Sequence, residues 1–213
     1  MNFVTSWSGG KDSCYAMMQA VEQGFTPKVL LNMMNENGKI SRSHGLPLSI
    51  LNQQAQKMQL PIETVPATWG DYEEKFITIL KSLKAKFDLE AAVFGDIDLQ
   101  AHRDWEEKVC QAASLKAVLP LWQQDRIALV NEMIENGIET MIVSCNMIMG
   151  ESYLGKTLDK ELALELLEKG IDPCGENGEF HTMVINCPLF LDKITLPAFT
   201  TTVHNNYCFV VWE

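Results

Sequence analysis

The stretch Ser6-Trp7-Ser8-Gly9-Gly10-Lys11-Asp12-Ser13 decides the fold of this chain. An apolar run over residues 2–7 leads into its glycines and predicts a buried strand. Residues 12–23 follow with helical spacing, and Gly24 ends that pattern. The two glycines therefore mark a turn from a strand into a helix.

A turn of this kind favours an anion. Gly9 and Gly10 permit positive φ and let a phosphate approach the backbone, while the first N–H groups and the dipole of the helix attract negative charge. Ser8 and Ser13 add hydroxyl donors, and Lys11 adds a positive charge. We therefore predict a phosphate loop, in which a branched side chain at position 9 blocks the ligand and leaves the fold intact.

The first half of the chain alternates strand and helix patterns. Short apolar runs separated by amphipathic stretches are typical of parallel strands joined by crossover helices. We predict strands at 2–7, 28–34, 62–66, 91–95 and 117–122, and helices at 12–23, 48–60, 72–87 and 101–113. The predicted fold class is α/β with a doubly wound parallel sheet, which binds ligands at the carboxyl edge of its strands.

The pattern changes after the polar step Gln123-Gln124-Asp125-Arg126. Proline-bearing loops separate the last predicted strands, and Gly170 ends the last helix. We predict helices at 127–135 and 160–169, and strands at 140–145, 179–187 and 206–212. The chain is therefore divided into a larger domain over 1–125 and a smaller α+β domain over 126–213.

Composition narrows the class of protein. The 213 residues are 46% hydrophobic and 21% charged, which supports a substantial core and argues against disorder. No apolar run reaches the roughly 18 residues that span a bilayer, and the first residues do not form a cationic secretion signal. We therefore expect a soluble, cytoplasmic protein. A formal net charge of −11 disfavours nucleic-acid and membrane partners.

Cysteines and histidines give no metal-binding pattern. The six cysteines form no CxxC pair, so we expect reduced, structural thiols rather than a zinc ribbon or a redox motif. His102 and His204 have no companion at ligand spacing and are expected to be structural or solvated.

The glycine loop departs from the Walker A pattern, because Thr5 stands where the first glycine would fall and Asp12 separates Lys11 from Ser13. It resembles instead the pyrophosphate loop of the N-type ATP pyrophosphatases. A second segment, Cys174-Gly175-Glu176-Asn177-Gly178-Glu179-Phe180-His181-Thr182, resembles the signature of the diphthine–ammonia ligase family. Three connecting motifs of that family are matched in order, namely Phe94-Gly95-Asp96-Ile97, Glu107-Lys108-Val109-Cys110 and Leu119-Pro120-Leu121-Trp122.

This resemblance implies a fold and a reaction. The fold is HUP-like, of the adenine nucleotide alpha hydrolase type, with an ATP pyrophosphatase domain over 1–125 and a substrate domain over 126–213. The reaction is that of an ATP-dependent amide ligase, which adenylates a carboxylate, transfers ammonia to it and releases AMP and pyrophosphate. In the family the carboxylate belongs to diphthine, a modified histidine of elongation factor 2.

The resemblance also implies roles for the loop residues. Ser8, Gly9, Gly10, Lys11, Asp12 and Ser13 are expected to hold the nucleotide phosphates, with Lys11 and Asp12 catalytic and Asp12 a magnesium ligand. One or two protein carboxylates are sufficient for a Mg²⁺ ion that bridges phosphate oxygens. A helix cap is the alternative role for Asp12.

Further candidates follow later strands. His44, Gly95 and Asp96 are expected near the nucleotide, although an ordinary surface-loop histidine explains His44 equally well. Glu107 is expected to bind the second substrate, but an ion pair with Arg103, four residues earlier on the same helix, is an equal alternative.

The second signature supplies candidates for the second substrate. Glu176, Asn177 and Glu179 are expected to receive ammonium or the acceptor carboxylate, with both glutamates catalytic. Gly175 and Gly178 support this expectation, because glycine suits places where the backbone must approach a ligand. Without the resemblance, two carboxylates in such a segment are more typical of a solvated turn.

Two other functions stay open from the sequence. One is a regulatory module that binds a nucleotide without turnover, and the other is an ATP pyrophosphatase acting on tRNA or on a small-molecule acceptor. The expected partners are ATP, ammonium and a carboxylate acceptor, which is elongation factor 2 diphthine if the host has it. The sequence does not decide the oligomeric state, and a homo-oligomer stays among the alternatives.

Overall fold

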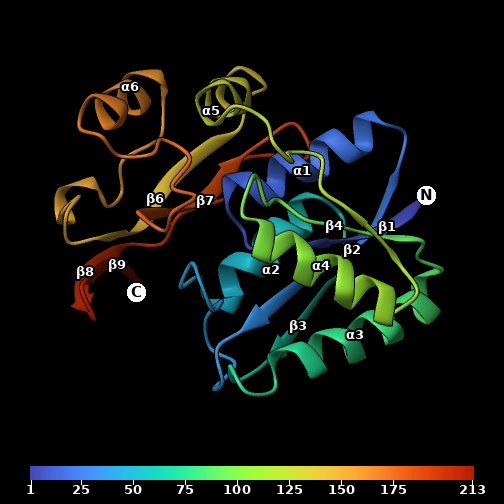
Figure 1. Ribbon diagram of the computed structural model, residues 1–213. Helices are drawn as coiled ribbons and strands as arrows, with labels where there is room; N and C mark the ends of the chain where they lie inside the picture. The colour runs from blue at the N-terminus through green and yellow to red at the C-terminus, as the bar shows by residue number, and fades with distance from the viewer.

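The computed structural model describes residues 1–213 and contains two sheets (Figure 1). The larger sheet is parallel, with strand order β3-β2-β1-β4-β5. Its strands are β1 (Asn2–Ser6), β2 (Thr26–Met34), β3 (Ile62–Pro66), β4 (Ala91–Val93) and β5 (Lys116–Val118). The connecting helices are α1 (Lys11–Glu22), α2 (Leu48–Lys57), α3 (Tyr72–Phe87) and α4 (Gln100–Ala112). The predicted doubly wound α/β class is confirmed, and the strand order reverses between β1 and β4, where such sheets bind ligands.

Helices cover both faces of this sheet. Phe3 of β1 packs in one buried cluster with residues of α1 and α2, whereas the next residue, Val4, packs with Phe76 of α3 and Val109 of α4. Successive side chains of a strand point to opposite faces, so α1 and α2 cover one face, and α3 and α4 lie side by side on the other (Figure 1). This double burial explains the continuous apolar runs of the strands. No helix has the length and apolar character needed to cross a membrane.

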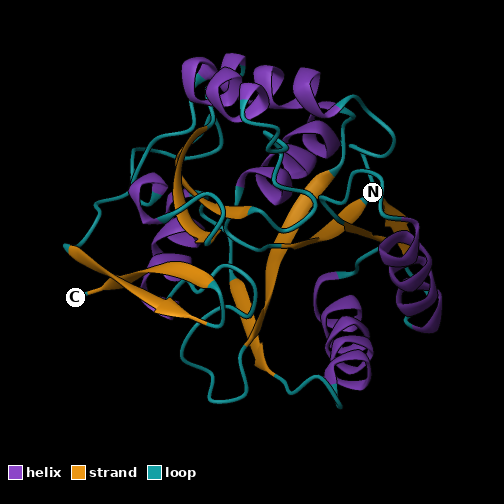
Figure 2. Ribbon diagram, turned by 60° about the vertical axis from the view of Figure 1, so that its left-hand side comes forward, coloured by secondary structure: helices purple, strands orange, loops and turns teal.

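The second sheet is antiparallel, with strand order β7-β6-β9-β8. Its strands are β6 (Glu139–Asn146), β7 (Phe180–Asn186), β8 (Phe199–His204) and β9 (Tyr207–Trp212). The helices of this part are α5 (Arg126–Glu135), η1 (Glu151–Tyr153) and α6 (Lys160–Glu168). The predicted smaller α+β part is therefore present, and Figure 2 shows its β8–β9 hairpin near the C-terminus.

Strand β8 is a correction, because a loop is predicted between Pro188 and Asn206. All six residues of β8 are exposed, so its sequence lacks the alternation that reveals a half-buried strand. Asn205 and Asn206 both have positive φ, of 47° and 65°, as a two-residue hairpin turn requires. The Asn-Asn pair between β-prone runs is the signal that identifies this hairpin.

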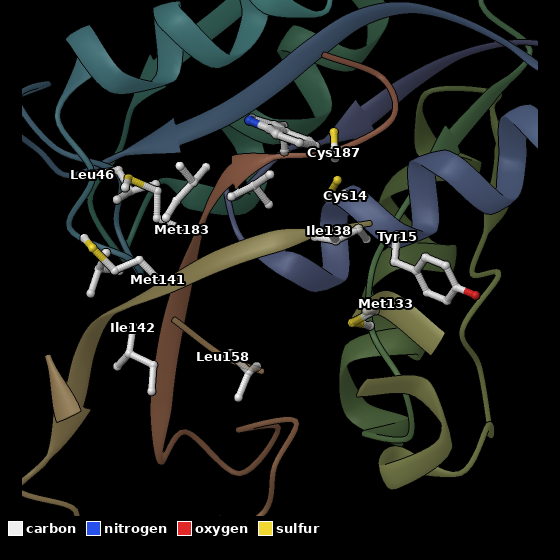
Figure 3. Packing of buried hydrophobic residues seen from close by; sticks show 14 of the residues in the cluster. Cys14, Tyr15, Leu46, Met133, Ile138, Met141, Ile142, Leu158, Met183 and Cys187 are labelled. Carbon is white, nitrogen blue, oxygen red and sulfur yellow. The ribbon is translucent and has the colours of Figure 1, made fainter. Parts of the chain in front are cut away.

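The two sheets share one hydrophobic core. A cluster of 41 buried residues includes Cys14 and Tyr15 of α1 together with Met141 and Met183 of the antiparallel sheet (Figure 3). All six cysteines are buried free thiols. We propose that the chain divides at 125/126, between β5 and α5.

Candidate active site

A cavity of about 340 Å³ opens at the carboxyl edge of the parallel sheet. It is lined by the loop after β1, residues 43–44, the loop after β4 with the start of α4, and residues 174–182. The predicted residues that line it are Ser8, Lys11, Asp12, Ser13, His44, Gly95, Asp96 and Glu176. Those that do not are Gly9, Gly10, Glu107, Asn177 and Glu179. Most of the residues predicted to hold the nucleotide are therefore brought together.

The loop after β1 is fixed to the antiparallel sheet by hydrogen bonds. The Lys11 N–H donates to Thr182 Oγ1 at 3.1 Å, and the Val184 N–H donates to the Gly9 carbonyl at 2.8 Å. Thr182 and Val184 both belong to β7. The conformation of the loop thus depends on residues about 170 positions later in the chain.

Two hydroxyl groups of the loop face the cavity. Ser8 Oγ lies 3.0 Å from Ser13 Oγ and accepts the Gly10 N–H at 3.3 Å, and Ser13 Oγ donates to the Gly10 carbonyl at 3.1 Å. These bonds place both hydroxyls beside the first turn of α1, whose dipole favours an anion.

Gly9 and Gly10 are closely packed against neighbouring residues, so neither position has open space for a side chain. Gly9 has φ +87°, and a Cβ there would lie 2.5 Å from Leu46 Cδ1 and 3.0 Å from Gln54 Oε1. A Cβ on Gly10 would lie 2.6 Å from His44 Nε2. The expectation that a branched residue at position 9 leaves the fold intact is therefore not supported, because its side chain would enter the packing with α2.

Lys11 and Asp12 form an ion pair at the start of α1, in which Lys11 is buried and Asp12 is 26% exposed. The Lys11 side chain is 4% exposed, and its Nζ lies 2.8 Å from Asp12 Oδ2 and also donates to the Cys174 carbonyl. Burial disfavours the ammonium, but the attraction of Asp12 outweighs it and raises the pKa of Lys11. Burial also raises the pKa of Asp12, against the opposing effect of Lys11.

Asp12 has an oxygen available for a cation. The N-cap of α1 is Gly10 and has no side-chain cap bond, so Asp12 does not cap the helix. Its Oδ1 is buried and has no hydrogen-bond partner. No group of three or more His, Cys, Asp or Glu side chains is arranged to hold a metal ion by itself. Asp12 therefore fits a magnesium site that phosphate oxygens complete.

The loop after β4 makes a close approach to α1. A Cβ on Gly95 would lie 2.6 Å from the Asp12 carbonyl carbon and 2.7 Å from the Ser13 nitrogen, so only glycine fits. The next residue, Asp96, enters the cavity with its Oδ1 2.6 Å from His102 Nδ1. His102 therefore contributes to the cavity, although it is expected to be structural or solvated.

A buried glutamate that the sequence does not single out supports Asp96. Glu106 on α4 is 3% exposed, and its carboxyl contacts that of Asp96. Burial and then Asp96 raise the pKa of Glu106 to about 11, which favours the neutral acid beside the Asp96 carboxylate. The predicted Glu107 is 52% exposed instead and forms an ion pair with Arg103 at 2.8 Å. Glu106 and Glu107 are adjacent on α4, but Glu106 is buried and Glu107 is exposed.

We expect Glu106→Gln to stabilise the protein above about pH 5. Glu106 is protonated in the fold to about pH 11 but ionises near its usual value of 4.5 when unfolded. Its contribution to stability is therefore complete below pH 4.5 and is lost as pH rises. Glutamine keeps a donor for Asp96 and does not titrate, so the gain should grow from about 1 kcal/mol at pH 5.5 to about 3 kcal/mol at pH 7.

Urea unfolding at these two pH values checks this prediction, with the exposed Glu107→Gln as the matched control. A loss of stability in Glu106→Gln at pH 7 would mean that Glu106 is ionised in the fold.

Glu176 enters the cavity from the segment before β7. Its Oε1 accepts the Ile97 N–H at 3.2 Å, and burial and then Asp12 raise the pKa of Glu176 to about 7. Asn177 and Glu179, joined by a hydrogen bond of 3.2 Å, line an open groove of about 530 Å³ instead. Glu176 therefore lines the cavity, whereas Glu179 lines the groove.

Two histidines whose rings are tilted against each other by 41° also line the cavity. The rings of His44 and His181 have centroids 4.6 Å apart. Burial lowers the pKa of His181 to about 4 and that of His44 well below its usual value, so both rings are neutral at pH 7. His181 and its neighbour Thr182 belong to the segment quoted for the family resemblance, and that segment is the sequence signal for them.

Both parts of the chain match domains of known proteins. Residues 1–117 match the diphthamide synthase N-terminal domain, and residues 125–211 match the diphthamide synthase C-terminal domain. One similar solved structure is that of the predicted subunit of tRNA methyltransferase from Methanocaldococcus jannaschii. The aligned region includes 88% of the present chain and 98% of the Methanocaldococcus jannaschii chain. The TM-score of this similarity is 0.48 and the sequence identity is 15%.

Curated relatives share the name diphthine–ammonia ligase. The Danio rerio protein is 31% identical over 98% of this chain and 91% of its own length, and the Homo sapiens protein is 30% identical over 93% and 84%. The Schizosaccharomyces pombe protein is 30% identical over 93% of this chain but only 36% of its own length. The predicted family and its ligase class are confirmed: this chain belongs to the diphthamide synthase family.

Proposed function

We propose that this chain is an ATP-dependent ligase that joins ammonia to the carboxylate of diphthine and releases AMP and pyrophosphate. The observation that carries the proposal is the single cavity in which the Ser8–Ser13 loop and Glu176 meet. The names of the curated relatives support diphthine as the acceptor.

In the first step, a carboxylate oxygen attacks the α-phosphorus, and the bond to the bridging oxygen of pyrophosphate breaks. Lys11 and the hydroxyls of Ser8 and Ser13 offset the charge that grows on the departing pyrophosphate. Asp12 would hold magnesium, which when bound neutralises phosphate oxygens. The acyl-adenylate and pyrophosphate are the products of this step.

In the second step, ammonia attacks the acyl carbon and AMP leaves. Glu176, with a pKa of about 7, is suited to bind ammonium as a carboxylate and to accept its proton. Asp96, held by Glu106 and His102, supplies a fixed negative charge on the same side of the cavity. Asn177 and Glu179 would contact the acceptor from the neighbouring groove.

The proposed partners are therefore ATP, ammonium and the diphthine of elongation factor 2. A cytoplasmic location agrees with six free thiols and with this acceptor.

Identification of the products tests this function. The protein is incubated with ATP, Mg²⁺, ¹⁵N-ammonium and diphthine-bearing elongation factor 2. We expect AMP and pyrophosphate in equal amounts by chromatography, and ¹⁵N in the factor by mass spectrometry. ADP as the sole nucleotide product would contradict the reaction, and AMP without label in the factor would contradict the acceptor. Binding of ATP without any turnover would favour a regulatory module.

A further inference from the structure

We propose that Arg126 is a positioning residue for Glu176: its guanidinium fixes the segment Asp172–Glu176 against the loop that follows β4. Arg126 lies outside the cavity, and no motif quoted above assigns it a role. Its side chain joins carboxylates from two distant parts of the chain.

On one side, Arg126 holds the loop that follows β4. Its Nε lies 2.8 Å from Asp98 Oδ2, and its Nη2 lies 2.6 Å from Asp98 Oδ1. This two-point contact uses the planar fork of the guanidinium. Asp98 is next to Ile97, whose N–H binds the Glu176 carboxylate.

On the other side, Arg126 holds Asp172, with Nη1 2.5 Å from Oδ2. Asp172 in turn orders the segment that follows it, because its Oδ1 accepts the Cys174 N–H at 2.9 Å and its Oδ2 accepts the Glu176 N–H at 3.1 Å. The Cys174 thiol also donates to the Arg126 carbonyl at 3.0 Å. Both the side chain and the backbone of Arg126 therefore fix this segment.

The segment carries two groups into the cavity. The Cys174 carbonyl accepts a hydrogen bond from Lys11, and the Glu176 side chain is held by the Ile97 N–H. Release of Asp172 would free the Glu176 backbone N–H and allow water to reach its carboxylate. Because the pKa of Glu176 is raised mainly by burial, this carboxyl reports directly on the position of the segment.

Titration of Glu176 tests the inference. In protein labelled with ¹³C at glutamate carboxyls, the Glu176 resonance is assigned by its loss in Glu176→Gln. We expect Arg126→Met to lower the pKa of Glu176 from about 7 to below about 6. The largest charge effects on this carboxyl come from Asp12, Asp96 and Lys11, and His102 and Glu106 also interact with it. Loss of the positive charge of Arg126 would by itself raise the pKa of Glu176, so a lowered pKa reports position.

Three further variants complete the test. Lys160→Met removes the same charge from an exposed ion pair with Glu135 and should leave the pKa of Glu176 at about 7. Arg126→Lys should recover only part of the effect, because lysine lacks the two-point fork. Asp98→Asn, which keeps the Arg126–Asp172 contact, should lower the pKa less, and it decides the case if Arg126→Met does not fold. An unchanged Glu176 titration in both Arg126→Met and Asp98→Asn would overturn the inference.

A kinetic measurement relates the position of Glu176 to amide formation. Its interpretation rests on the proposed function. Arg126→Met should raise KM for ammonium at least about tenfold while the Kd for ATP changes less than about threefold. If the wild type forms no amide, the proposed function fails and the titration still decides the role of Arg126. If the wild type forms amide and KM for ammonium is unchanged in Arg126→Met, the positioning role is rejected.

Discussion

Replacement of Lys11 by methionine is expected to reduce pyrophosphate release by about 10²–10³-fold, the usual effect of removing one preorganised charge from a developing anion. Lys11 is buried and lies at the end of the loop that faces the cavity. Methionine fills a similar volume but supplies no charge and no donor. The measurement is the rate of pyrophosphate release at saturating ATP, ammonium and acceptor.

The same variant leaves the Asp12 carboxylate without its partner, and because Asp12 is 26% exposed, the cost should be less than the roughly 3–5 kcal/mol of a fully buried unpaired charge. The double variant Lys11→Met/Asp12→Asn removes both charges and should recover most of that stability without recovering activity. A folded double variant with turnover within tenfold of wild type would remove Lys11 from the phosphate chemistry.

Glu176→Gln is expected to lower amide formation by about 10²–10⁴-fold and to leave ATP affinity almost unchanged. In the proposed function, the carboxylate would face the second substrate, whereas the phosphates would lie against the loop after β1. Because the pKa of Glu176 is about 7, the wild-type rate should rise as pH increases through 7 and the carboxylate forms. The variant should lack this rise when the concentration of free ammonia is held constant across the pH profile of single-turnover amide formation.

Glu168→Gln, an exposed position at the end of α6, is the control and should behave as wild type. Glu179→Gln should have a smaller effect than Glu176→Gln, since Glu179 lines the groove outside the cavity. A loss of ATP affinity above tenfold in Glu176→Gln would instead assign Glu176 to the nucleotide.

Much of the fold could be predicted because its signals are local. The central strands β1, β2 and β4 are largely buried and appear as apolar runs, and Gly9 and Gly24 bracket the first helix. Strand β8 could not be found in this way, because it has no buried face and its threonine-rich sequence shows no contrast between its two sides.

The site could be predicted only where a motif is continuous in the sequence. The Ser8–Ser13 loop is such a case. The choice between Glu106 and Glu107 is different, because adjacent residues on a helix point about 100° apart, and only the position of Asp96 across the sheet edge distinguishes them. Arg126 gives no sequence signal at all, since its partners Asp98 and Asp172 lie 28 and 46 residues away.

The hydrogen bonds that join the loop after β1 to β7 have a consequence for the evolution of the sequence. Gln54 donates to the carbonyls of Gly9 and Val184, at 3.0 and 2.9 Å, and Thr182 accepts the backbone N–H of Lys11. A chimaera that took its first 125 residues from one relative and the rest from another would bring together two surfaces that never evolved in contact. Residues 1–125 and 126–213 are therefore expected to change together during evolution, even though each part matches a separate family domain.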